Sequence, residues 1–182
     1  MWVTIDTVVD FEYLNRENMN EITHNMRRRI FIILTIIWMI VIFAFSAKDA
    51  DESGHASYEV GLTIGRIFIV DFEKQPVEEQ LAFAASVDHP VRKTAHVLEY
   101  AVLGFLVMGA IYGLSVKWYI QCLISWALAT LYATTDEFHQ LFVPGRSGEF
   151  KDVCIDSAGV LLGVLLGVGI LHIIHNKTNK LE

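Results

Sequence analysis

The feature that most constrains the fold is an uncharged apolar run at residues 30–47, IFIILTIIWMIVIFAFSA. A helix that crosses a membrane needs about 17 to 25 mostly apolar residues. Three further stretches, at residues 97–114, 118–135 and 153–174, approach this pattern and carry few charges. Because backbone amides cannot bond to water inside lipid, each stretch is expected to form a helix. The sequence therefore predicts an all-α, polytopic membrane protein with four transmembrane helices.

Composition supports this class and argues against others. Charged residues make up 19% of the chain, below the roughly 25% of an average soluble domain. The net charge of −7 argues against nucleic acid as a partner, because a phosphate-binding surface needs positive charge. Cys122 and Cys154 lie in apolar runs. They are predicted to be reduced thiols in the core, since two cysteines cannot build a disulfide scaffold.

Positive charge beside the spans predicts the orientation. Arginines at 27–29 directly precede the first span. Residues 1–26 are therefore expected to form a cytoplasmic tail, and residues 27–47 the first transmembrane helix. Residues 48–94 then form an extracytoplasmic loop. Residues 95–182 form a core of three spans that returns the C-terminus to the cytoplasm, so both termini of this multi-pass protein are predicted to be cytoplasmic.

Two features near the N-terminus allow other interpretations. Met26 stands immediately before the arginines and is an alternative start, in which case residues 1–25 are not translated. The first apolar run is also compatible with a cleaved signal peptide, because small residues follow it, although it is long for one.

The extracytoplasmic loop is predicted to contain short amphipathic helices. Apolar residues recur at helical spacing between Tyr58 and Phe72, and a second short helix is expected at residues 77–86, after Pro76. Amphipathic helices beside a span often lie on the membrane surface. The alternative is that they pack as a lid on the bundle, and the sequence does not choose between the two.

Polar residues at the ends of the last three spans are the clearest functional signal, because such residues are costly in a membrane. The second span begins with a polar face, the third ends with a polar cluster and the fourth begins with two aspartates. In chain order these residues are Arg92, Lys93, His96, Glu99, Tyr100, Asp136, Glu137, His139, Gln140, Asp152 and Asp156. Alternating topology brings the three clusters to the outer leaflet, which predicts one site.

A turn between the third and fourth spans is expected to add a cation to this site. Pro144 and Gly145 predict a tight turn. Such a turn presents Arg146 beside the carboxylates, where it could hold a phosphate or carboxylate group. A plain surface hairpin between helices is the alternative.

A glycine stripe predicts close packing of the fourth span. Gly159, Gly163 and Gly167 recur at a spacing of four residues, which lets two helices approach closely. Asp152 and Asp156 continue this stripe outward. They are therefore expected to point into the bundle and not at lipid.

Three roles are open for this constellation. In the first, histidine and carboxylate act as general acid and base, and the catalytic candidates are His96, Glu99, Asp136, Glu137 and His139. The substrate-binding candidates are Arg92, Lys93, Tyr100, Gln140, Arg146, Asp152 and Asp156. In the second, histidines and carboxylates hold zinc or manganese, although no residue is assigned as a metal ligand and the cofactor stays open. In the third, the charges only lock helix ends together.

The same residues resemble the motifs of the VanZ-like membrane protein family, over residues 30–172. The matching features are Phe45-Ser46, Lys93-x-x-His96-x-x-Glu99-Tyr100-x-x-Leu103-Gly104, Asp136-Glu137-x-His139-Gln140, Phe142-Val143-Pro144-Gly145-Arg146 and Asp152-x-x-x-Asp156-x-x-Gly159. Family members usually carry Asn where Asp156 stands. The resemblance implies a small bacterial protein of the cytoplasmic membrane.

The resemblance also implies a function at the cell envelope. The name-giving member of the family raises resistance to the glycopeptide teicoplanin, so a contribution to antibiotic resistance of this type is expected. The expected partners are membrane lipid and either a lipid-linked envelope precursor or a glycopeptide. A homo-oligomer formed through the glycine stripe is a further option.

Two other functions are weighed against this one. A membrane lipid-phosphate hydrolase needs a His nucleophile and a set of Lys or Arg residues, which Lys93 and the turn at 144–147 resemble weakly. Its second His followed by Asp is not found in order. The other alternative is a non-catalytic scaffold or transport component, although the apolar inner halves of the spans disfavour a transport path.

Overall fold

In the computed structural model, which describes residues 5–178, the chain folds into five α-helices and one short 3₁₀ helix, with no strand among these residues. Side chains are described from residue 21 onward, except at 175 and 178. The elements are α1 (Ile5–Ser46), α2 (Ala50–Phe68), η1 (Phe72–Lys74), α3 (Val77–Ile111), α4 (Trp118–Gln140) and α5 (Phe150–Thr178). The predicted all-α class is confirmed.

Three of the described helices are long and apolar enough to cross a membrane. They comprise Glu21–Ser46 of α1, the whole of α3 and Phe150–Ile174 of α5. Large apolar side chains on these helices face outward, as lipid contact requires; Ile33 of α1, for example, is 56% exposed. The helix α4 has 23 residues but is not among the three, so a fourth span stays a prediction.

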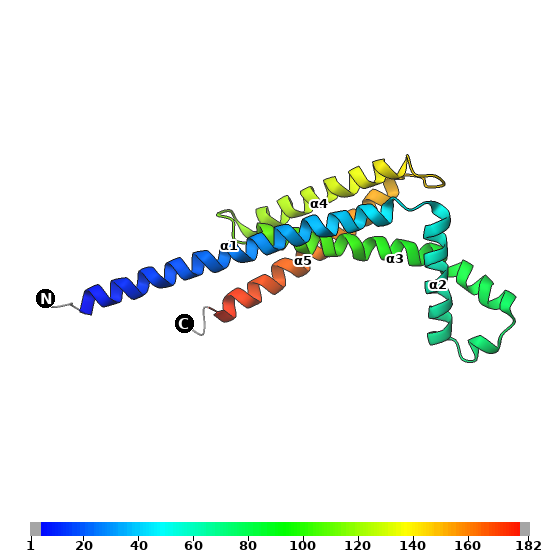
Figure 1. Ribbon diagram of the computed structural model, residues 1–182, viewed down its shortest axis with the longest axis horizontal. Helices are drawn as coiled ribbons and strands as arrows, with labels where there is room; N and C mark the ends of the chain where they lie inside the picture. Colours follow the sequence, from blue (N-terminus) through cyan, green and yellow to red (C-terminus); the bar gives the residue numbers. More distant parts are fainter. Residues whose placement is uncertain (1–4, 179–182) are drawn as a thin grey trace.

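The four long helices run side by side, and α1 begins at the same end of the bundle at which α5 ends (Figure 1). α5 packs mainly against α3 and α4, and α3 also packs against α1 and α2. Fully buried side chains of α3 and α5 form the centre of the core, among them Tyr100, Leu103, Met108, Val160 and Val164. α3 is therefore the central helix of the fold.

Two predicted boundaries differ from the structure. The short helix expected at 77–86 and the second span are one helix of 35 residues that continues through Pro90. A proline in a helix interior costs about 3 kcal/mol, and packing of α2 against this part of α3 offsets that cost: Gly61 of α2 lies directly against Ala84 and Val87. The predicted N-terminal tail is likewise helical from Ile5 and continuous with the first span.

The extracytoplasmic loop of the prediction is a helical hairpin. α2 begins at a cap formed by Asp49, whose side chain accepts a hydrogen bond of 2.8 Å from the backbone N–H of Glu52. The buried residues Ser57, Gly61 and Gly65 lie along one side of α2. α2 thus packs on the first half of α3 (Figure 1), while Phe68, at its end, is 78% exposed.

The glycine stripe of α5 lies against α3, as predicted. A Cβ atom on Gly159 would lie 2.5 Å from the carbonyl oxygen of Val97, and one on Gly163 would overlap the carbonyl of Ala101. From the other side, Gly104 of α3 faces the backbone of Val160. The two backbones are therefore close enough that no side chain fits between them.

The cysteine prediction is half right. Both thiols are free, but Cys154 is exposed and therefore not in the core, while Cys122 is half-buried. Cys154 lies two positions before the buried Asp156, and this spacing places them about 200° apart around a helix. The face of α5 that buries Asp156 consequently turns Cys154 outward.

Exchange of Gly163 for alanine is expected to destabilise the protein, because the added methyl group forces α5 away from Ala101. Overpacking of this kind costs about 1 to 3 kcal/mol, which lowers the melting temperature of the detergent-solubilised protein. Gly169→Ala is the matched control, since nothing lies within 4 Å of a Cβ at that position. Its melting temperature should be unchanged or higher, because alanine favours helix. Equal melting temperatures of the two variants would contradict close packing along the stripe.

Candidate functional site

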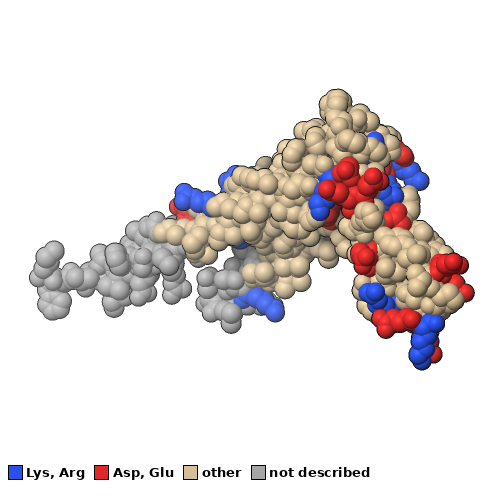
Figure 2. Space-filling model, turned by 45° about the vertical axis from the view of Figure 1, so that its right-hand side comes forward, with Lys and Arg blue, Asp and Glu red and all other residues tan. Residues whose placement is uncertain are grey.

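Most charged side chains gather at one end of the molecule and over the adjoining α2–α3 hairpin; a few lie toward the opposite end, and the visible face of the bundle's middle is uncharged (Figure 2). We call the first of these ends the polar end. It is formed by the last turns of α1 and α4, the first turns of α5 and the middle of α3, together with the loop that joins α4 to α5. Polar residues from all three predicted clusters lie here.

A cavity of about 190 Å³ lies at the polar end. Its polar lining consists of side chains that the sequence singled out, namely Arg92, His96, Glu99, Asp136 and Arg146, together with Ser46, Lys48, Ser53 and Ser57. Its apolar lining includes Ile42, Phe45, Val60 and Val91. The cavity therefore offers charged groups and apolar surface side by side.

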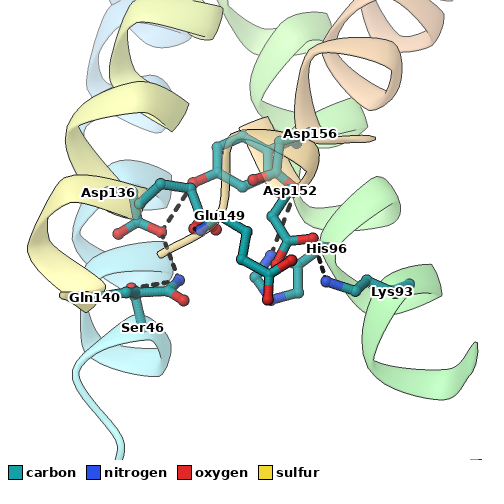
Figure 3. Close-up of polar contacts among 10 residues, drawn as sticks. Ser46, Lys93, His96, Asp136, Gln140, Glu149, Asp152 and Asp156 are labelled. Atoms are coloured by element: carbon teal, nitrogen blue, oxygen red, sulfur yellow. Dashed lines mark hydrogen bonds and ion pairs between the residues drawn. The ribbon is translucent and has the colours of Figure 1, made fainter. Parts of the chain in front are cut away.

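Asp136 is the centre of a buried hydrogen-bond network. The hydroxyl of Tyr100, which is fully buried, donates to Asp136 Oδ2 at 2.9 Å. Gln140 Nε2 lies 3.4 Å from the same oxygen and donates to Ser46 Oγ at 3.0 Å. This network joins α3, α4 and the last residue of α1 (Figure 3).

A second cluster joins α3, α4 and α5. His96 Nδ1 lies 3.5 Å from Asp156 Oδ1, and Figure 3 shows the two side chains facing one another. Ligand atoms of His96, Glu137 and Asp156 all lie within 4.8 Å of one another. Glu137 is 4% exposed and Asp156 is 0% exposed, so the charges of this cluster are taken out of water.

Two further ion pairs lie around these clusters. Lys93 pairs with Asp152 and so links α3 to the start of α5 (Figure 3). Arg92 pairs with Asp88 at 3.2 Å, one helical turn earlier on α3. Ser57 of α2 donates to that same Asp88, which fastens the α2–α3 hairpin to the polar end.

Arg146 projects from the loop between α4 and α5 into the cavity. Its Nε donates to the carbonyl of Lys48 at 3.2 Å. No carboxylate of the described residues lies within 4.0 Å of its guanidinium. Burial, and after it the charge of Arg92, lowers the pKa of Arg146, and nearby carboxylates oppose that shift. An anion in the cavity would offset both causes, because an opposite charge nearby favours the charged form of the guanidinium.

One predicted site residue lies apart from the rest. The ring of His139 packs on Phe43 of α1, with the ring centres 4.6 Å apart. It belongs neither to the cluster of His96, Glu137 and Asp156 nor to the cavity lining. The two histidines that the sequence suggested as joint metal ligands therefore take part in different contacts.

Sequence reasoning missed other residues of the polar end. Asp88 was not singled out, although its spacing of four residues from Arg92 predicts an ion pair on a helix face. Ser57 gave no signal, because its role depends on how α2 packs against α3. Lys48 takes part through its backbone carbonyl, which no side-chain motif reveals.

Comparison with protein-family models matches residues 31–172 to the VanZ/LLP1 family. The chain belongs to this family. The resemblance predicted from its motifs is thereby confirmed. The matched region of this VanZ-like protein includes the polar end. Searches of curated proteins and of solved structures gave no match.

Several VanZ-like motifs of the chain lie where its helices touch one another. The pairs Tyr100–Asp136, Lys93–Asp152 and His96–Asp156 each connect two motifs that lie far apart in the sequence. Because each pair joins different helices, the motifs both build the polar end and supply its chemistry.

Replacement of Tyr100 by phenylalanine tests the Asp136 network. The variant keeps the buried ring but leaves Asp136 Oδ2 with only the 3.4 Å contact from Gln140, and a hydrogen bond to a charged group contributes about 1.5 to 3 kcal/mol. We expect a lower melting temperature in detergent than for the unchanged protein. Tyr119→Phe is the control, because Tyr119 is 51% exposed. If the two variants melt at the same temperature, the Tyr100 hydroxyl contributes nothing to the fold.

Proposed function

We propose that this VanZ-like membrane protein binds the phosphate-bearing head group of a lipid-linked cell-envelope component in the cavity at the polar end. The observation that carries the proposal is Arg146, a half-buried guanidinium at the cavity without a carboxylate partner among the described residues. Arginine matches the geometry of phosphate oxygens and forms strong charge-assisted hydrogen bonds with them.

The surroundings of Arg146 favour a lipid over a free ion. Arg92 lies at the same cavity and adds a second positive charge. Apolar side chains of α1 and α2, such as Phe45 and Val60, also line it. A ligand with a charged head and an apolar tail matches both kinds of surface.

The proposal also includes the orientation of the protein in the membrane and a fourth transmembrane helix, α4. In it, α4 crosses the membrane beside the three apolar helices, so four crossings leave both termini in the cytoplasm and the polar end at the outer leaflet. The arginines at 27–29 support this orientation. The position of the start of α1 and the end of α5 at one end of the bundle agrees with it.

Binding at this position offers a route to glycopeptide resistance. An envelope component held at the outer leaflet is less available to a glycopeptide that acts outside the cell. We therefore include a contribution to teicoplanin-type resistance in the proposal, on the strength of the family. The proposed activity is binding, and no chemical step on the lipid is part of it.

Exchange of Arg146 for glutamine is expected to weaken phosphate-lipid binding by about 10- to 100-fold, because a hydrogen bond to a charged group contributes about 1.5 to 3 kcal/mol. The assay titrates purified protein with phosphatidylcholine vesicles that contain or lack a polyprenyl phosphate. Arg66→Gln is the matched control, since Arg66 pairs with Glu73 on the surface of the hairpin. Teicoplanin susceptibility at equal expression is the cellular readout. Equal binding by both variants would contradict the role of Arg146.

Cysteine labelling tests the proposed orientation in a background with Cys122→Ser and Cys154→Ser. Glu59 of α2 and Lys177 of α5 are exposed, so a thiol at either position is accessible to a reagent. We expect a membrane-impermeant maleimide to label Glu59→Cys in intact cells, and Lys177→Cys only after permeabilisation. The opposite pattern would place the polar end in the cytoplasm.

A further inference from the structure

The cluster of His96, Glu137 and Asp156 contains more buried polar atoms than its own contacts satisfy. His96 Nδ1, Glu137 Oε1 and both oxygens of Asp156 are buried and have no hydrogen-bond partner among the described residues. The other oxygen of Glu137 accepts from the backbone N–H of Glu149 at 3.2 Å. The three side chains come from α3, α4 and α5, so the packing of three helices aims them at one point.

Charge makes this arrangement unfavourable by itself. With both carboxylates ionised and the imidazole neutral, the cluster would carry a charge of −2, and a buried charge without a partner costs several kcal/mol. The nearby lysine, Lys93, is already paired with Asp152. The guanidinium of Arg146 has no carboxylate of the described residues within 4.0 Å, Glu137 and Asp156 included. A divalent cation would neutralise a cluster in that state and give a partner to one ligand atom of each of the three side chains.

We propose that His96, Glu137 and Asp156 bind a divalent transition-metal ion of the zinc or manganese type. Imidazole nitrogen and carboxylate oxygen are ligands of both ions. Around zinc, with ligand distances of about 2.1 Å, tetrahedral ligand atoms lie about 3.4 Å apart. The 3.5 Å between His96 Nδ1 and Asp156 Oδ1 already matches this spacing, and closure of the 4.8 Å cluster needs only small side-chain movements.

The proposed site has three protein ligands, which leaves a coordination position for a further oxygen. His96 belongs both to this cluster and to the cavity lining. A cation held here therefore lies next to the cavity in which Arg146 is placed, and it would supply a second positive partner for a phosphate oxygen. This use of the ion rests on the proposed function, whereas the binding of the ion does not.

The decisive experiment measures metal content. Purified protein, with any affinity tag removed, is incubated with Zn²⁺ or Mn²⁺, desalted and analysed by elemental mass spectrometry. We expect close to one ion per chain for the unchanged protein. Asp156→Asn and Glu137→Gln each remove one anionic ligand and should weaken binding at least about ten-fold, because loss of even an indirect metal partner costs that much.

Glu149→Gln is the matched control, since it removes an exposed carboxylate from the same end of the molecule and keeps the three ligands. It should bind metal like the unchanged protein. The melting temperature gives a second readout: the ion should raise it in the unchanged protein and in Glu149→Gln, but not in the two ligand variants. If one of the two ligand variants does not fold, the metal content of the other tests the proposal.

Three results would overturn the proposal. They are no retained metal in the unchanged protein, equal retention by the Asp156→Asn variant, and loss of metal from Glu149→Gln to the same extent as from the ligand variants. The first would mean that Glu137 and Asp156 are kept neutral by protons instead. If the protein binds polyprenyl phosphate but no metal, only the metal site is refuted and the proposed function stands. If it binds metal but no polyprenyl phosphate, only the proposed function is overturned.

Discussion

The direct contact between the backbones of α3 and α5 is the constraint on which the polar end depends. Gly159 rests on Val97 and Gly163 on Ala101, so the register of the two helices is fixed over more than one turn. Asp156 lies one turn before Gly159, and His96 directly precedes Val97. The same contact that excludes side chains between the helices therefore sets Asp156 against His96. A shift of α5 by one residue would separate this pair and the pair of Lys93 with Asp152 as well.

The polar end meets the cost of buried charge in two different ways. Around Asp136 a tyrosine hydroxyl and a glutamine amide from two helices share one carboxylate oxygen, while the other oxygen has no hydrogen-bond partner among the described residues. Around Asp156 the protein supplies the His96 ring and a second carboxylate instead of several donors. A network of the first kind stabilises the fold through its own hydrogen bonds. A cluster of the second kind is stabilised by what it binds, whether that is a proton or a cation.

Hydropathy predicted the helical class, because a stretch that crosses lipid must satisfy its backbone hydrogen bonds within itself. The resemblance of the polar motifs predicted the family. The length of α3 could not be predicted, since its continuity through Pro90 depends on contacts with α2. The separation of Glu137 from His139 followed from geometry that the sequence does contain. At about 100° per residue, two residues apart on α4 lie on nearly opposite sides, so one side chain points toward α5 while the other packs on Phe43 of α1.

Two properties are proposed for the polar end, phosphate recognition and cation binding, and Asp156 takes part only in the second. An Asn at this position would keep an oxygen ligand but would remove the negative charge that Asp156 can bring to the cluster. The attraction for a divalent cation is accordingly strongest in a chain that carries aspartate here. The Arg146 turn belongs to the motifs on which the resemblance rests, and its guanidinium faces the cavity independently of residue 156. The proposed phosphate recognition thus rests on a motif that matches the family, whereas the proposed cation binding depends on the carboxylate of Asp156.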